Sequence, residues 1–220
     1  MNIGVENGHR VEGLHYRRAV LAGQGHVGRE LVVALEGGDL IDHDPQALRL
    51  GDPALEDFFT EEYALNHLIH TYPKPYIAFM DGICMGGDVG LSVHGSHRIV
   101  TEKTRFAMPE TGIGYFPDVG GTWALSRAPQ HLGFWIGLTG ATIGAADTIA
   151  AGLADAMVPS EALPALLADI ASGQTVESAI KAHAVDPGVS MLKDNAVLID
   201  SVFASEDMEE IFAALQANGS

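Results

Sequence analysis

The segment from Lys74 to Gly121 constrains the fold of this 220-residue chain more than any other segment does. A continuous apolar run, Tyr76 to Met80, leads directly into a cluster of three glycines, Gly82, Gly86 and Gly87. Such a run is typical of a buried strand. Glycine at a strand-to-helix junction lets backbone N–H groups approach a ligand at a positive helix N-terminus. We therefore expect a strand–turn–helix unit whose backbone can bind a negatively charged oxygen.

The other expected elements alternate between strands and helices. Asp52 and Pro53 form a helix-start pair, so a helix is predicted from Pro53 to about His70. Beyond the first unit, the pattern predicts a strand or hairpin over 97–108, helices at 89–93, 120–126, 131–138 and 144–151, and amphipathic segments at 161–171, 175–183 and 207–216. This alternation predicts the α/β class.

Three carboxylates are candidates for chemistry. Glu110 and Asp118 lie on separate loops that contain glycine and proline. Glu62 falls on the apolar stripe of the helix that begins at Pro53, and an unpaired charge in that position is costly unless it faces a pocket or a polar partner. Asp118 has a structural alternative, because it could cap the helix expected to begin near Gly120.

Composition excludes several classes of partner. The net charge of −17 argues against nucleic acid and against anionic membrane surfaces. The single cysteine, Cys84, excludes an internal disulfide and suits a reducing compartment. The N-terminus lacks the apolar region of a signal peptide, and no stretch is long enough to span a bilayer. These features predict a soluble, cytoplasmic protein.

Several segments resemble a known family. DGICMGG, HGSHRIVTEKTRFAMPETGIG and FPDVGGTWALSR are similar to the crotonase (enoyl-CoA hydratase/isomerase) superfamily, and most of all to its 3-hydroxyisobutyryl-CoA hydrolase branch. The resemblance covers about residues 51–220. It implies a crotonase-like fold of repeated strand–strand–helix units, truncated at both ends. The expected division is a poorly matched segment at 1–50, a crotonase-like core at 51–160 and a helical segment at 161–220.

The resemblance also assigns roles to residues. The acid/base carboxylate of the family falls on Glu110, and the second active-site carboxylate of the branch falls on Asp118. Glu62 matches a substrate-contacting glutamate, and Gly87 matches the glycine whose N–H group binds the oxyanion. The loop that supplies the other oxyanion donor corresponds to Glu36–Asp39, where glutamate replaces the alanine of the family.

Two further positions depart from the related enzymes. The first glutamate of the hydratases falls on Gly90, so a paired hydration mechanism would lack one of its two carboxylates. Asp88 replaces a glycine of the branch. Its carboxylate suits the first turn of a helix but adds negative charge beside the expected oxyanion site. Gly90 therefore favours hydrolysis over hydration, and Asp88 predicts slow turnover.

The resulting hypothesis is an acyl-CoA thioester hydrolase. The resemblance implies that 3-hydroxyisobutyryl-CoA and water give 3-hydroxyisobutyrate and coenzyme A, as in valine catabolism. It implies no metal or redox cofactor, because coenzyme A arrives with the substrate, and it allows a homo-oligomer. The alternatives are an enoyl-CoA hydratase or isomerase, and a catalytically impaired crotonase-fold protein that binds acyl-CoA.

Other motifs have weaker support. Residues 23–28 fit a dinucleotide-binding fingerprint, with Asp42 or Asp44 at a suitable distance for the ribose. A dinucleotide fold needs several strand–helix units, however, and residues 1–50 hold about one. The histidine pairs 67/70 and 94/97 have helical spacing but no third ligand at motif spacing, so solvated or core histidines are favoured.

Overall fold

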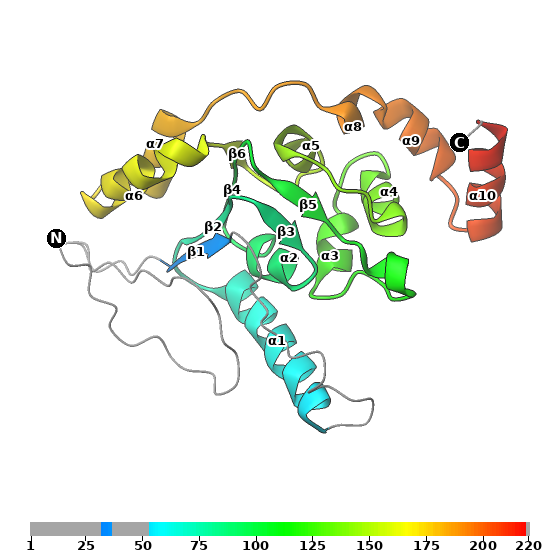
Figure 1. Cartoon of the computed structure of the whole chain (residues 1–220), viewed down its shortest axis with the longest axis horizontal. Coiled ribbons are helices and arrows are strands. Elements are labelled where there is room, and N and C mark those ends of the chain that lie inside the picture. Colours follow the sequence, from blue (N-terminus) through cyan, green and yellow to red (C-terminus); the bar gives the residue numbers. More distant parts are fainter. Residues whose placement is uncertain (1–31, 37–52, 219–220) are drawn as a thin grey trace.

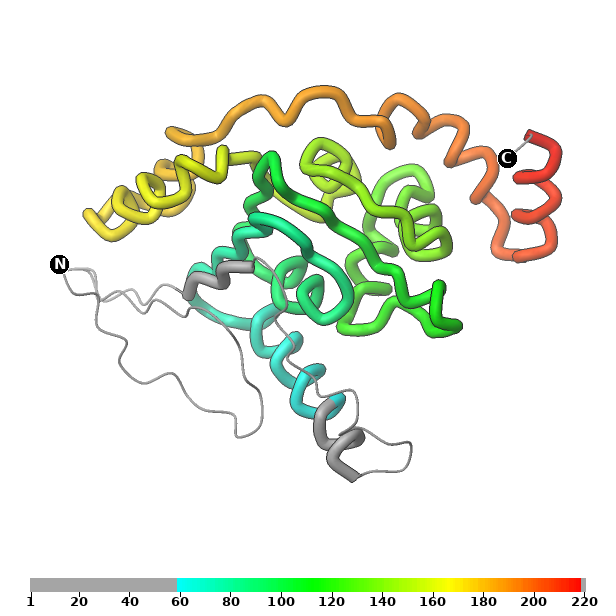
Figure 2. The backbone as a smooth tube through the Cα atoms, in the orientation of Figure 1, coloured from blue at the N-terminus to red at the C-terminus, as the bar shows by residue number. Residues whose placement is uncertain are grey.

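The structure is a computed structural model that describes the backbone of residues 32–36 and 53–218 and the side chains of residues 59–218 (Figure 2). Within these residues, a four-stranded sheet has the order β1-β2-β4-β6, and every neighbouring pair is parallel. Its strands are β1 (Val32–Glu36), β2 (Tyr76–Met80), β4 (His97–Val100) and β6 (Ala156–Met157). Helix α1 (Pro53–Thr71) lies between β1 and β2 along the chain, which is the crossover that parallel pairing requires. The α/β class is confirmed.

Strand β2 is buried on both faces, which explains its unbroken apolar run. Ile77 and Phe79 are fully buried and pack in a cluster with Leu166 of helix α6 (Leu163–Ala171). Ala78 packs on the other side, in a cluster with Ile69 of α1. Because successive strand residues point to opposite faces, one short strand contributes to two apolar layers.

A second, two-stranded sheet carries the segments of interest. Strands β3 (Ile83–Met85) and β5 (Arg105–Ala107) are parallel neighbours. Helix α2 (Gly87–Ser92) begins directly after β3, and the short 3-10 helix η1 (Glu110–Ile113) follows β5. The carboxyl ends of parallel neighbours lie at the same edge of a sheet. The glycine turn (Gly86 and Gly87, between β3 and α2) and the loop that carries Glu110 therefore leave the sheet from one edge.

Helices surround the two sheets. Figure 1 shows α6 and α7 (Val176–His183) at one end of the molecule, while the last three helices extend past α5 (Ala145–Ala150) and α4 (Leu132–Thr139) to the other end. His131 Nδ1 lies 2.7 Å from Asp200 Oδ1, which ties helix α9 to the start of α4. The remaining helices are α3 (Gly121–Leu125), α8 (Met191–Asp194), α9 (Ala196–Val202) and α10 (Met208–Ala217).

Most of the expected elements are confirmed within a few residues, but two expectations need correction. Residues 97–108 do not form a hairpin, because β4 pairs with β2 and β6 whereas β5 pairs with β3. The helix expected at 89–93 begins at Gly87. Strands β3 and β6 and helices α8 and α9 were not predicted, since elements this short show no clear period.

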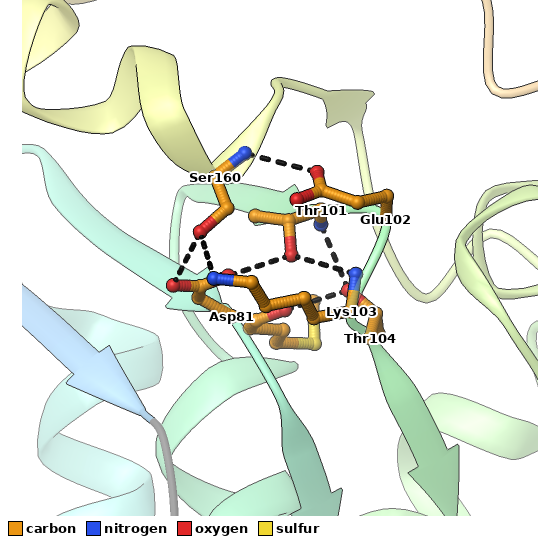
Figure 3. A network of polar contacts seen from close by, with 7 residues as sticks. Asp81, Thr101, Glu102, Lys103, Thr104 and Ser160 are labelled. Carbon is orange, nitrogen blue, oxygen red and sulfur yellow. Dashed lines mark hydrogen bonds and ion pairs between the residues drawn. The ribbon is translucent and has the colours of Figure 1, made fainter.

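A polar network joins the places where the chain passes between the two sheets (Figure 3). Asp81 follows β2, and its carboxylate accepts hydrogen bonds from Thr101 Oγ1 at 2.8 Å and Ser160 Oγ at 2.9 Å. Lys103 Nζ donates to the same serine oxygen at 2.5 Å. The Thr104 hydroxyl donates to the backbone oxygen of Met80, the last residue of β2. The network therefore sets the orientation of the small sheet relative to the large one.

Asp81→Ala should lower the free energy of unfolding by about 1–3 kcal/mol, because two partly buried hydroxyl groups lose their acceptor. Urea denaturation followed by circular dichroism measures the effect. Glu161→Ala removes an exposed acid beside Ser160 and should change stability by less than about 0.5 kcal/mol. Equal losses in the two variants would mean that the network does not hold the sheets together.

Candidate active site

Glu110 lies at the carboxyl end of β5, as the first residue of η1. The residue is only 8% exposed, and its Oε2 atom has no hydrogen-bond partner among the residues that the structure describes. Burial raises the pKa of Glu110, and the negative charge of Asp118 adds to the increase. A buried carboxylate with a raised pKa and an uncommitted oxygen is suited to proton transfer.

The Asp118 carboxylate faces helix α1. Tyr63 OH donates a hydrogen bond to Asp118 Oδ2 at 3.1 Å. Helix α3 begins at Gly121 after Gly120, and it has no side-chain cap. The alternative that Asp118 serves as an N-cap is therefore wrong: its backbone oxygen accepts from the Gly121 N–H, but its carboxylate is committed elsewhere.

Glu62 immediately precedes Tyr63 on α1 and is half-buried. Burial raises the pKa of Glu62 to about 7, and the negative charge of Asp118 contributes to this increase. Asp118 thus acts on both glutamates, which places the three carboxylates that the sequence singled out in one region. With a pKa of about 7, Glu62 is partly protonated at neutral pH.

The glycine turn lies beside Glu110. Gly86 has φ 57°, a left-handed conformation that favours glycine, and a Cβ added there would lie 3.6 Å from Glu110 Oε1. Gly87 begins α2, and the N–H groups in the first turn of a helix have no partner within the helix. Asp88 is the next residue of that turn, and it is the acidic residue in the first turn of α2.

Gly90 is enclosed by two residues that the sequence did not single out. A Cβ added to Gly90 would lie 2.6 Å from Asn66 Nδ2 and 2.7 Å from Val119 Cβ, so no side chain fits there without movement. Asn66 is only 6% exposed, and within the described residues neither atom of its amide has a hydrogen-bond partner. Asn66 follows Glu62 by four residues and therefore lies on the same face of α1, and this spacing could have identified it from the sequence.

Most of the remaining sequence motifs lie outside the residues that the structure describes. Strand β1 ends at Glu36, but Gly37–Asp39 and the residues of the dinucleotide-binding fingerprint lie outside the described residues. Residues 59–218 contain no group of three side chains that could hold a metal ion. The described helices likewise include none that is both long and apolar enough to cross a membrane.

A sequence model of the enoyl-CoA hydratase/isomerase family matches residues 34–220, so the match begins earlier than residue 51. The mitochondrial 3-hydroxyisobutyryl-CoA hydrolase of Xenopus tropicalis is 43% identical over 84% of this chain and 50% of its own length. The small ribosomal subunit protein mS47 of Neurospora crassa is 41% identical over 73% of this chain and 35% of its own length. The chain therefore spans half or less of the length of these curated relatives.

A solved structure is also similar to this chain. The carnitinyl-CoA dehydratase from Mycobacterium thermoresistibile superposes with a TM-score of 0.73 at 44% identity, over 77% of this chain and 50% of that chain. The crotonase-like fold expected from the sequence is confirmed by this likeness. The expectation of a cytoplasmic location gains no support, because the named hydrolases from Xenopus are mitochondrial.

Gly90→Ala should lower the free energy of unfolding by about 1–3 kcal/mol, because the added methyl group overlaps Asn66 and Val119. Thermal and urea denaturation measure the loss. Gly112→Ala is the matched control, since nothing lies within 4 Å of a Cβ at that position. If Gly90→Ala were as stable as the control, the space around Gly90 would be more open than the structure indicates.

Glu62→Gln should stabilise the protein at pH 8 but not at pH 4. The pKa of Glu62 rises from 4.5 to about 7 on folding, so the folded state binds the proton more tightly. Its contribution to stability is complete below pH 4.5 and is lost as pH rises through about 7. Glutamine avoids that loss, so the gain at pH 8 should be roughly 1–3 kcal/mol in urea denaturation. An equal effect of the substitution at both pH values would contradict the raised pKa.

Proposed function

This chain belongs to the enoyl-CoA hydratase/isomerase family, and we propose that it hydrolyses the thioester bond of an acyl-coenzyme A. The observation that carries the proposal is the position of Glu110, a buried carboxylate beside the glycine turn that opens α2. Thioester hydrolysis needs a carboxylate and backbone N–H donors. The enclosed Gly90 leaves no space for the second glutamate that the hydratases of the family use.

In the proposed reaction, Glu110 either attacks the thioester carbonyl carbon or removes a proton from a water molecule that attacks it. Both routes convert the carbonyl oxygen into an oxyanion, which the N–H group of Gly87 stabilises. Collapse of the oxyanion breaks the C–S bond, and the departing thiolate takes up a proton. If Glu110 attacks directly, an anhydride forms and water then cleaves it. Each route consumes one water molecule and releases a carboxylic acid and coenzyme A.

Asp118 and Glu62 would support this step. The Tyr63 hydroxyl donates a hydrogen bond to Asp118, and the charge of Asp118 adds to the effect of burial, which raises the pKa of Glu110. With a pKa of about 7, Glu62 is partly protonated at neutral pH and can donate a hydrogen bond to the substrate as well as accept one. We assign it to substrate contact.

The proposed substrate is 3-hydroxyisobutyryl-CoA, because relatives with 41–43% identity are named as hydrolases of this thioester. A place in valine breakdown, a cytoplasmic location and a homo-oligomeric state remain predictions. So does the expectation that no cofactor is needed beyond the coenzyme A of the substrate. Because the chain spans half the length of these hydrolases, its own activity requires a direct test.

Two other functions have a specific observation in their favour. The solved relative with 44% identity is described as a dehydratase, which suggests addition or removal of water, although Gly90 opposes this. Another relative is named as a ribosomal subunit protein, which suggests a role without turnover. The negative charge of Asp88 in the first turn of α2 would oppose an oxyanion at Gly87 and also favours slow or absent turnover.

Glu110→Gln should reduce thiol release from 3-hydroxyisobutyryl-CoA by about a hundredfold or more, because the amide can neither attack nor accept a proton. Thiol release is measured with a chromogenic thiol reagent, and loss of absorbance from crotonyl-CoA is measured beside it. Binding of the thioester, measured by calorimetry, should be retained. The matched control is Glu161→Gln, which changes an exposed glutamate and should leave the rate unchanged.

The outcomes separate the three functions. Thiol release that depends on Glu110 supports hydrolysis. Loss of crotonyl-CoA absorbance without thiol release would indicate hydration instead. Binding without either reaction would indicate the role without turnover, and a Glu110→Gln variant that kept more than a tenth of the wild-type rate would remove Glu110 from the mechanism.

A further inference from the structure

The turn that follows Asp118 has an unfavourable backbone conformation. Val119 has φ 44° and Gly120 has φ 74°, so two consecutive residues adopt left-handed conformations. Glycine does so without cost, but a β-branched residue with positive φ is a true outlier. Such conformations persist only where the surrounding structure imposes them, and they cluster at functional sites. The turn therefore needs a restraint from elsewhere in the molecule.

His94 supplies that restraint. Its Nε2 lies 2.8 Å from the backbone oxygen of Val119, and because a carbonyl only accepts, Nε2 carries the proton and donates. The ring also covers the turn closely, since a Cβ added to Gly120 would lie 2.5 Å from the same nitrogen. His94 is only 9% exposed, so the hydrogen bond is largely shielded from water.

The His94 ring is itself fixed by neighbours from two helices. Trp123 of α3 lies 5.9 Å away between ring centroids, and His70 of α1 lies edge-on at 6.1 Å. Burial lowers the pKa of His94, and the nearby His70 ring adds to the decrease, although the hydrogen bond to Val119 opposes it. These contacts keep the ring neutral and in place, just beyond the end of α2.

We propose that His94 is a positioning residue that holds the Val119–Gly120 turn and thereby directs the Asp118 carboxylate toward Tyr63, Glu62 and Glu110. The catalytic consequence rests on the proposed function, but the placement of Asp118 does not. His94 lies just beyond α2, the helix that begins at Gly87. Helix α2 therefore connects the proposed oxyanion donor, Gly87, to the residue that positions Asp118.

A matched pair of variants tests the hydrogen bond. The side-chain amide of His94→Gln can reach the Val119 oxygen, whereas that of His94→Asn is too short. In His94→Asn, thiol release should fall by about tenfold or more, since small displacements of catalytic groups have large effects on rate. Glu62, titrated by NMR of its carboxyl carbon, should show a lower midpoint than in the wild type, because the negative charge of Asp118, which adds to the effect of burial, moves away. His94→Gln should resemble the wild type in both measurements.

A second substitution tests whether strain in the Val119–Gly120 turn causes the loss of rate in His94→Asn. Val119→Gly removes the cost of the left-handed conformation, so the double variant with His94→Asn should recover most of the lost rate and the Glu62 midpoint. His70→Asn is the control, because it removes a ring from the same cluster without touching the turn hydrogen bond; it should leave the Glu62 midpoint unchanged.

Two results would overturn the proposal. One is a His94→Asn variant with the wild-type Glu62 midpoint. The other is a double variant that folds, as judged by circular dichroism, but recovers neither the rate nor the Glu62 midpoint, which would mean that strain in the turn is not what His94 opposes. If the wild type releases no thiol, the proposed hydrolase function fails, but the Glu62 titration still tests the role of His94.

Discussion

The burial of β2 on both faces is the constraint on which the rest of this structure depends. Ile77 and Phe79 face the cluster that α6 helps to form, while Ala78 faces α1. A strand enclosed in this way cannot shift its register without exposing one apolar set. The Asp81 network then holds the carboxyl end of β2 at the junction with the small sheet. The glycine turn and the Glu110 loop both depend on that junction.

The candidate site concentrates unfavourable interactions in one place. Burial, with a contribution from the charge of Asp118, raises the pKa of Glu62 and Glu110. Glu110 also has an oxygen without a partner among the described residues, and Val119 has an outlying backbone conformation. Each of these features costs stability. Folded proteins tolerate such destabilising features mainly at functional sites, where the function requires them.

Within this family the fold does not decide the reaction. Relatives with 41–44% identity carry the names of a hydrolase, a dehydratase and a ribosomal subunit protein. One fold can host unrelated functions, so the decision rests with particular residues. In this chain, Gly90 is enclosed by Asn66 and Val119, so a glutamate at that position of α2 would not fit without movement of its neighbours. The space around Gly90, rather than the overall architecture, therefore bears on the choice between hydration and hydrolysis.

Apolar period and glycine geometry act over a few residues, so the central strand, the start of α1 and the glycine turn could be predicted without the structure. Together with a family resemblance, the sequence also identified Glu62, Glu110 and Asp118 as candidates. Three features became visible only in the folded chain: β4 and β5 join different sheets, Asp118 accepts a hydrogen bond from Tyr63, and Gly90 is enclosed. Tyr63 and Asp118 are 55 residues apart, and contacts over such separations leave no local pattern in the chain.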